Sequence, residues 1–518
     1  MQQQILVIGA TGYVGGRLVP LLLKKGYTVH ALTRNPQKIR SRPWGNHPQL
    51  IISQGDMHDK ESIRPAVEKC DIIYYLVHSM EAKYSDFSEA DRYAAYNLVE
   101  TLKGATHKRL IYLSGLFPKE AELSPHLRSR AEVARILSLA DAQLTTLRAA
   151  QLIGAGSASF EMLRWLTDRV PVMLTPKWTY VQTQPISITD ALNYLTSVIE
   201  CPETIGQSYD IGGPDILSYK DLVHLYAKSA NLRKRWLIPF PWMTFKFSAQ
   251  LVHLFTPIPY ALALPLLEGM RNEVICQDNR IREVIPLDLM PIELAIENAL
   301  GHTRDQDISS SWLDAGLPSM PEWVILGDAQ HAQGTVYSDG YSIRLDATPE
   351  EVWQPIVKIG GSTGWYSKNI LWKTRGIIDI IFGGPGLVRG RRSMEDLYVG
   401  DSLDFWRVLE IHPLQKLLLI TEMRLPGVGL LDLSIHPGLQ GHQGHQRHAS
   451  QKEEDGTTLT LSLYFKPHGI GGRLYWHLVS PFHRFVFLAM LKSIAQRLSK
   501  PILSPAARVK APQFKKGA

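Results

Sequence analysis

Residues 4–16 read QILVIGATGYVGG, an apolar run followed by glycines at positions 9, 12 and 15. A glycine after a strand permits a tight turn, a second lets the backbone approach a pyrophosphate, and a third lets the next helix pack closely. The amino end of that helix offers N–H groups and partial positive charge to phosphates. The pattern predicts a dinucleotide site formed by Gly9, Thr11, Gly12, Tyr13, Val14 and Gly15.

Strand-like and helical patterns alternate outward from this motif. Apolar runs cover 4–8, 28–32, 50–53, 72–77, 110–113 and 144–147, with helical periodicity between them. Short, almost wholly apolar strands separated by helices are typical of a parallel sheet covered on both faces. We therefore expect an α/β Rossmann fold, a doubly wound parallel sheet, in a domain of residues 1–305 whose irregular later part is a small substrate lobe.

The net charge of +7 is concentrated at the two ends of the chain. Residues 1–55 contain seven Lys or Arg and no acid, and the last 18 residues contain four bases and no acid. Subtracting both from +7 leaves −4 for residues 56–500. A slightly acidic body argues against a general nucleic-acid groove, so we expect no nucleic-acid partner.

The cysteines and an uncharged apolar segment indicate in which cellular compartment the protein is expected. Three cysteines lie far apart with no CxxC pair, which is typical of a reducing cytoplasm. Residues 247–267 carry no formal charge but contain three prolines, which break a membrane-spanning helix. We expect a buried helical pair or lid there, with peripheral membrane contact as an alternative.

The end of the second expected strand bears on the choice of cofactor. A site for NAD uses a carboxylate about 20 residues after the glycines, whereas a 2′-phosphate is held by arginine. Arg34 lies 19 residues after Gly15, and no Asp or Glu precedes Asp56. The sequence predicts NADP(H), with NAD(H) as the alternative. A solvated loop is the competing interpretation of Arg34, Lys38 and Arg40.

Several short motifs are spread over residues 1–300: GATGxxG (9–15), TRNP (33–36), GD (55–56), LSG (113–115), LR (147–148), IG (153–154) and 206–214. Together they resemble the atypical short-chain dehydrogenase/reductases, among them nucleotide-sugar epimerase-like and sensor-like proteins. The resemblance implies that Asp56 and Met57 flank the adenine, and that Leu76, Val77 and His78 line the nicotinamide-ribose side.

The sequence departs from that family where its chemistry resides. Catalytic members carry Tyr-x-x-x-Lys on the helix after the fifth strand, whereas the stretch after Ser114 reads HLRSR at 126–130. A histidine with a basic neighbour can relay a proton near neutral pH, and Arg130 would hold the nicotinamide ribose. We expect Ser114, His126 and Arg130 to carry any catalysis. A surface His126 and a structural Ser114 are the alternatives.

A polar stretch broken by Gly and Pro over 306–339 predicts a linker to a second domain. Residues 341–347 then alternate as a strand, 348–351 read TPEE as a capping-box helix start, and four strand-like runs precede a helix from about 481 to 499. We expect an α+β domain over 340–500 and a basic flexible tail over 501–518.

This order resembles the START-like (polyketide cyclase/lipid transport) superfamily and, more narrowly, a two-part bacterial family of unknown function. The narrower match rests on GWY (364–366), DFWR (404–407), FKP (465–467) and YW (475–476). The resemblance implies a helix-grip fold around a cavity for a hydrophobic ligand. Aromatic side chains that simply fill the cavity are the alternative.

Two polar segments of this half have competing interpretations. GGPGLVRGRR at 383–392 resembles an anion cradle, and a tight turn with solvated arginines is the alternative. His436, His442, His445 and His448 lie close enough to bind zinc or copper, but no carboxylate or cysteine joins them. We therefore expect no metal site.

Taken together, these features predict an NADP(H)-binding oxidoreductase for a hydrophobic carbonyl or alcohol. A non-catalytic NADPH-binding redox sensor or scaffold is the first alternative. A membrane-proximal lipid or quinone binder is the second. The oligomeric state and the substrate stay open, because fold resemblance supports a cofactor better than a reaction.

Overall fold

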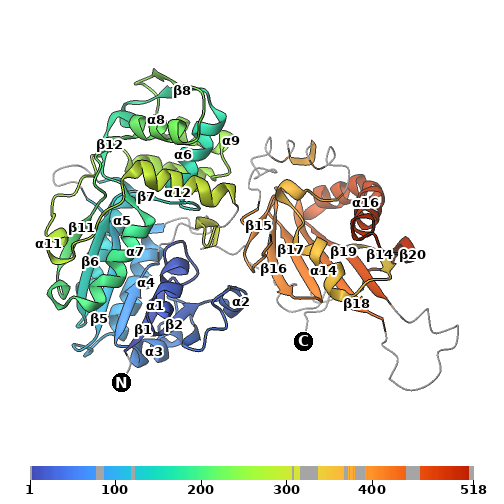
Figure 1. Cartoon of the computed structure of the whole chain (residues 1–518), viewed down its shortest axis with the longest axis horizontal. Coiled ribbons are helices and arrows are strands. Elements are labelled where there is room, and N and C mark those ends of the chain that lie inside the picture. The colour runs from blue at the N-terminus through green and yellow to red at the C-terminus, as the bar shows by residue number, and fades with distance from the viewer. Residues whose placement is uncertain are drawn as a thin grey trace. The chain divides into compact units, whose positions relative to one another are not determined.

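The computed structural model describes residues 3–77, 87–117, 123–305, 308–314, 336–366, 391–393, 395–438 and 456–512, with a few residues between 372 and 379. The chain divides into two compact units, Met1–Gly316 and Leu317–Ala518 (Figure 1). The short helix η4 (Trp312–Asp314) therefore belongs to the first unit, although the sequence assigned it to the linker.

The first unit is built on a seven-stranded parallel sheet in the order β11-β6-β5-β4-β1-β2-β3. Helices lie on both faces, so the prediction of a doubly wound Rossmann sheet is confirmed (Figure 1). The strands are β1 (Gln4–Ile8), β2 (Thr28–Thr33), β3 (Leu50–Gln54), β4 (Ile72–Tyr75), β5 (Arg109–Gly115), β6 (Gln143–Ala149) and β11 (Ser208–Ile211).

The covering helices bury one apolar face each against this sheet. One face carries α1 (Gly15–Lys24), α2 (Pro36–Arg40) and α7 (Ile188–Ser197). The other carries α3 (Lys60–Lys69), α4 (Phe87–Thr101) and α5 (Pro125–Leu137). Strand order reverses between β1 and β4, and the crevice outside the carboxyl ends of strands at such a point is the usual ligand site.

A lobe of helices and short strands completes the first unit. Residues 247–267 form parts of α9 and α10, which pack on each other with Ala249, Ala263 and Leu267 buried. Neither helix is long enough to span a membrane. The elements are β7 (Leu152–Ile153), α6 (Ala158–Arg169), β8 (Val172–Thr175), η1 (Lys177–Tyr180), β9 (Gln182–Thr183), β10 (Ile186–Ser187), η2 (Val198–Glu200), η3 (Pro202–Thr204), β12 (Leu217–Ser218), α8 (Tyr219–Ser229), β13 (Trp236–Pro239), α9 (Phe245–Phe255), α10 (Tyr260–Gly269), α11 (Ile281–Val284) and α12 (Ile292–Arg304).

The second unit is an antiparallel seven-stranded sheet in the order β15-β16-β17-β18-β19-β14-β20, with a long helix (Figure 1). The capping box predicted at Thr348 is confirmed, since Thr348 and Glu351 bond each other's backbone N–H. The elements are β14 (Tyr337–Leu345), α14 (Pro349–Val357), η6 (Gly361–Thr363), β15 (Ser402–Leu403), β16 (Trp406–His412), β17 (Lys416–Thr421), β18 (Gly427–Pro437), β19 (Thr457–Pro467), α16 (Gly469–Leu498) and β20 (Ile502–Val509).

The expected flexible tail is in fact largely a strand. β20 pairs antiparallel with β14 at the edge of the sheet, and Arg508 forms an ion pair with Asp339 of β14. The basic composition concealed this role because the acid that pairs with Arg508 lies 169 residues earlier.

Aromatic side chains pack on one another in the core of the second unit. Trp365 stacks on Phe405 with ring centroids 6.0 Å apart, and Phe465 stacks on Trp476 at 5.7 Å. Trp476 and Phe487 bring α16 into the same core. These contacts favour the interpretation in which aromatics occupy the space between sheet and helix.

Candidate functional site

Two of the three loop glycines are required by close packing at the switch point. Gly9 has φ +90°, and a Cβ there would lie 3.0 Å from the backbone of Leu76. A Cβ on Gly15 would lie 2.2 Å from the Gly9 carbonyl oxygen. Because β1 and β4 remain paired up to this point, with the Leu76 N–H donating to Ile8 O at 3.0 Å, the loop has no room to shift.

The amino end of α1 has the character that a pyrophosphate needs. Its N-cap residue, Val14, provides no side-chain hydrogen bond, and the first turn contains no acid. Thr11, Gly12, Tyr13 and Val14 are partly exposed there. Backbone N–H groups and the helix dipole can therefore face an anion, so these residues fit a dinucleotide.

The side chain of Tyr13 points into the protein instead of toward this loop's open side. Its hydroxyl is buried without a hydrogen-bond partner among the described residues, and burial raises its pKa. A Cβ on Gly154 would lie 2.6 Å from that hydroxyl, and the Arg17 guanidinium lies 4.9 Å from the ring centroid. Only the backbone of Tyr13 is placed to meet a phosphate.

Arg34 follows β2 in a segment whose backbone is firmly held. The Thr33 hydroxyl bonds Asn35, and Asn35 caps α2 by accepting from the Gln37 N–H at 3.0 Å. Arg34 is exposed between them. Burial would raise the pKa of Asp56, but hydrogen bonds from His58 and the charge of Arg34 hold it below its ordinary value. Arg34 and Asp56 therefore lie near each other at the expected adenosine end.

Two other bases of the acid-free region are already engaged within the first unit. The Lys38 ammonium donates to the Asp314 carbonyl oxygen at 2.6 Å, and the Arg42 guanidinium forms an ion pair with the Asp314 carboxylate at 3.1 Å. Lys38, Arg42 and Asp314 are all buried. The interpretation of Lys38 as a solvated base is therefore wrong, because its partner comes from a distant part of the chain.

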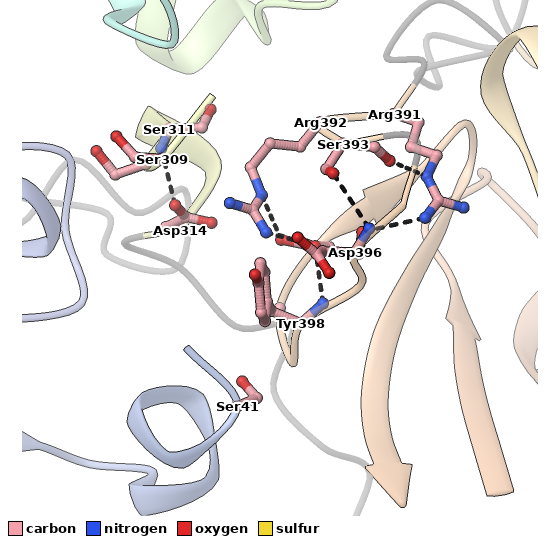
Figure 2. A network of polar contacts seen from close by, with 12 residues as sticks. Ser41, Ser309, Ser311, Asp314, Arg391, Arg392, Ser393, Asp396 and Tyr398 are labelled. Carbon is pink, nitrogen blue, oxygen red and sulfur yellow. Dashed lines mark hydrogen bonds and ion pairs between the residues drawn. The ribbon is translucent and has the colours of Figure 1, made fainter. Parts of the chain in front are cut away.

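Segment 308–314 also contacts the glycine loop. The Ser310 hydroxyl donates to Tyr13 O at 2.6 Å, and Arg17 donates to Ser310 O at 3.3 Å and to Ala155 O at 2.7 Å. The Ser311 N–H closes the segment on the Asp314 carboxylate at 2.8 Å (Figure 2). The segment is thus fastened to α1 and α2, the two elements that flank the expected cofactor.

Buried polar groups gather where β5 and β6 end. Ser114 pairs with Arg148 across these strands, and its hydroxyl is buried without a partner among the described residues. Gln151, two residues beyond β6, has a buried side-chain oxygen that also lacks a hydrogen-bond partner among the described residues. Leu76 and Val77 follow β4 at the same edge, whereas His78 lies outside the described residues.

Met57 is held by a residue that the sequence did not single out. Asn97 of α4 donates its side-chain N–H to Met57 O at 2.8 Å, and both residues are buried. An asparagine three residues after Ala94 and next to Leu98, both buried, was the available signal.

The expected catalytic helix, α5, begins as a regular capped helix. Ser124 accepts from the Leu127 N–H at 3.3 Å, and Pro125 occupies the first turn. His126 and Arg130 therefore lie one turn apart, although the side chain of His126 is outside the described residues. Burial raises the pKa of Tyr75 of β4, and the charge of Arg130 opposes that rise. Arg130 is thus near Tyr75, whose hydroxyl is buried and unpaired among the described residues.

The lobe contains a cavity of about 320 Å³. Gln151 lies in its wall and also lies two residues beyond β6, so the cavity reaches the carboxyl end of that strand. Trp178 lines it too and has a buried indole N–H without a partner among the described residues. The remaining wall is mainly apolar and includes Met162, Leu163, Leu166, Val172, Leu237, Leu251, Val252 and Phe255.

The arginines after the glycine-rich segment of the second unit are internal. Arg391 is buried and donates to the carbonyl oxygen of Ser393 and to Asp396 O at 3.0 Å (Figure 2). It also donates to the carbonyl oxygen of Val357 and to Ile359 O at 2.9 Å. Burial lowers its pKa to about 10. Arg392 forms an ion pair with Asp401 at 3.0 Å. Neither an anion cradle nor a solvated turn describes these two residues, and 383–390 lie outside the described residues.

The described residues contain no group of three or more His, Cys, Asp or Glu side chains that could hold a metal. His436 lies on β18, whereas His442, His445 and His448 lie outside this part of the chain. The prediction about the histidine cluster therefore remains a prediction.

Comparisons with known proteins agree with this division. Residues 9–156 match a family described as NAD(P)H-binding, and residues 331–490 match a family described as protein of unknown function (DUF2867). The first unit thus contains a Rossmann-like sheet whose residues 9–156 match an NAD(P)H-binding family. The second unit is an antiparallel-sheet domain that matches a family whose function is not known.

Individual relatives match part of the chain. The chain is 23% identical over 301 residues to an NADH dehydrogenase [ubiquinone] 1 alpha subcomplex subunit 9 of Arabidopsis thaliana, covering 56% of this chain and 74% of that protein. It is 26% identical over 118 residues to a cinnamoyl-CoA reductase 1 of Petunia hybrida, covering 22% and 35%. A nucleoside-diphosphate-sugar epimerase structure from Staphylococcus aureus aligns with a TM-score of 0.47 at 16% identity, covering 57% of this chain and 100% of that one.

Proposed function

We propose that the protein is an NADP(H)-dependent oxidoreductase that reduces a hydrophobic carbonyl compound or oxidises the matching alcohol. The observation that carries this proposal is the apolar cavity whose wall includes Gln151, two residues beyond β6. A substrate in that cavity would have its polar end at the carboxyl edge of the sheet. The sequence assigned the hydrophobic ligand to the second domain, whereas the cavity favours the lobe of the first unit.

The chain's own residues would bind and orient the substrate. The unpaired Ser114 hydroxyl can donate to a carbonyl oxygen, and the unpaired Gln151 oxygen can accept from an alcohol. Reduced nicotinamide, when bound, supplies hydride to the carbonyl carbon, and a proton must reach the oxygen to complete the alcohol. We assign that proton to His126 and the positioning of the nicotinamide ribose to Arg130, both on α5.

Cofactor preference tests the first half of the proposal. Calorimetric titration at fixed salt should give tighter binding of NADPH than of NADH. Arg34→Glu should weaken NADPH binding by about tenfold or more, because a charge-assisted bond to the 2′-phosphate is lost. Arg40→Glu is the matched control, since Arg40 is also exposed on the adjoining helix. Equal affinity for both nucleotides would refute the preference.

Substrate size tests the second half. A series of aldehydes and ketones of increasing chain length should show kcat/KM rising with apolar length, measured as NADPH oxidation. Leu166→Trp should remove that trend by filling the cavity, whereas Leu139→Trp, at an exposed position of the same unit, should keep it. A trend unchanged in Leu166→Trp would place the substrate elsewhere.

One observation favours a second candidate, a redox sensor that turns over no substrate. Segment 308–314 contacts Tyr13 and Arg17 on one side of the expected cofactor and Lys38 and Arg42 on the other, and it leads into the second unit. Cofactor binding could thus alter the start of the linker. NADPH-dependent protection of residues 306–340 from protease, without turnover of any carbonyl, would support the sensor.

A further inference from the structure

One face of α16 exposes a continuous apolar stripe. Ile470, Leu474, Leu478, Phe482 and Phe485 are 57–85% exposed, at spacings of four, four, four and three residues. On a helix of 3.6 residues per turn this spacing keeps them within about 120° of the circumference and over about 22 Å of length. Scattered exposed apolar residues are ordinary, but an ordered row on one helix face indicates an interaction surface.

The other face of α16 is committed to the core of its own unit. Trp476, Phe487, Met490 and Ile494 are buried, and α16 packs on β14, β19 and β20. The His483 ring nitrogen lies 3.1 Å from the Asp339 carboxylate of β14. Among the described residues this is the helix long and apolar enough to cross a membrane by length and composition. If α16 crossed a membrane, it would lose these contacts with its own unit. Any partner of the exposed stripe must therefore bind while α16 stays packed on the sheet.

The charge of α16 is one-sided. Residues 469–498 contain Arg473, Arg484, Lys492 and Arg497 and no Asp or Glu. Arg473 and Arg484 are exposed, as is His477, and by helical spacing all three lie along one border of the stripe. An apolar stripe bordered by cations on a helix without acids is complementary to an anionic lipid surface: the side chains enter the acyl boundary and the cations meet the headgroups.

We propose that the second unit docks on anionic membranes through this face of α16, with the helix axis parallel to the membrane plane. A second copy of the chain would have to cover the same stripe with a face that carries the same cations, which is unfavourable. The inference does not rest on the proposed function, because it concerns the other unit and needs no cofactor.

Co-sedimentation of the full chain with vesicles tests it. We expect binding to vesicles of phosphatidylglycerol and phosphatidylcholine in a 3:7 ratio, little binding to pure phosphatidylcholine, and weaker binding as salt rises. Leu474→Glu/Phe485→Glu should lower the vesicle partition coefficient by about tenfold or more, and Arg473→Glu/Arg484→Glu should do so on anionic vesicles alone. Both pairs are exposed, so the unfolding midpoint should not move.

Two further variants test whether vesicle binding depends on the stripe of α16 and not on other exposed apolar side chains. Leu139→Glu, at an exposed position of the first unit, should bind like the wild type. Trp242→Glu tests the exposed aromatic edge around β13, where Trp236 and Trp242 are 63% and 81% exposed. Loss of binding in Trp242→Glu but not in Leu474→Glu/Phe485→Glu would overturn the inference, as would absent vesicle binding. A dimer seen by light scattering that Leu474→Glu/Phe485→Glu dissociates, without any lipid effect, would assign the stripe to a second copy.

Discussion

The two units treat buried polar side chains differently. In the first, Ser114, Gln151 and Trp178 keep polar atoms buried without partners among the described residues, and they lie at the sheet edge or in the lobe cavity. In the second, Asp404 accepts from the Trp365 indole N–H at 2.8 Å and from the Gly361 N–H at 3.2 Å. Trp406, with an unpaired indole N–H, is an exception there.

This difference separates groups held for a ligand from groups that hold the fold. A buried polar atom without a partner costs about 1–3 kcal/mol, so several at one edge are a cost that a bound molecule would remove. A buried polar group that makes all its hydrogen bonds avoids this penalty and stabilises the folded state. Substitutions at the carboxyl edge of the first unit's sheet should therefore change ligand binding more than stability. Substitutions in the hydrogen-bond network of the second unit should change stability more than ligand binding.

The largest loss of stability should follow Arg391→Met. The change leaves the carbonyl oxygens of Val357, Ile359 and Asp396 without their buried donor, at an expected cost of about 4 kcal/mol in the unfolding of the second unit. Denaturant unfolding followed by tryptophan fluorescence would measure it. Arg473→Met, which removes an exposed arginine, is the control. A loss below about 1 kcal/mol would mean that water replaces Arg391.

The first unit has a comparable network around Asp314, and Asp314→Asn tests it. Arg42 would keep its buried charge without the compensating carboxylate, which should cost about 3 kcal/mol. Asp305→Asn, at an exposed position just after α12, is the control. If Asp314→Asn instead tightened NADPH binding without loss of stability, Lys38 and Arg42 would be ligands of the phosphate and segment 308–314 a competitor.

Local patterns predicted the elements, and distant partners explain the failures. The glycine spacing after β1 and the capping box at Thr348 act within a few residues, so both are visible in the sequence. The basic excess of residues 1–55 suggested free cations, but Asp314 neutralises part of it from far along the chain. The basic tail was likewise expected to be flexible because the partner of Arg508, Asp339, lies far away in the sequence. Pairing across hundreds of residues leaves no periodic trace.

The candidate site divides in the same way. The glycine loop and Arg34 were predictable because phosphate recognition relies on backbone and charge at fixed spacing. Gln151 and Trp178 were not, since their significance comes from a cavity that seven separate elements of the lobe line and from a buried polar atom without a partner among the described residues. A sequence shows a polar residue but not whether folding gives it a partner.

A smaller, pH-dependent effect should follow Asp339→Asn in the second unit. Burial would raise the pKa of Asp339, but hydrogen bonds from His483 and Arg508 hold it below the ordinary value of 3.8. Its ionised form therefore stabilises the folded unit above about pH 4, and this contribution is lost as pH falls through the lowered pKa. We expect a loss of about 2 kcal/mol at pH 7 that vanishes in strong acid. Asp346→Asn, at an exposed position next to β14, should show no such dependence.

The smallest effect on stability, and the sharpest test of the comparison, should be that of Ser114→Ala. The hydroxyl has no partner to lose among the described residues, so the free energy of unfolding should change by less than about 1 kcal/mol. NADPH affinity should also be kept, whereas kcat should fall by about tenfold or more if the hydroxyl holds the reacting oxygen. Ser129→Ala is the matched control: its hydroxyl donates to Asp91 at 3.3 Å, so it should lose stability and keep turnover. A Ser114→Ala protein with unchanged turnover on every carbonyl that the wild type reduces would make the unpaired hydroxyl a feature of the cofactor fold alone. The sensor would then be the better account of the first unit.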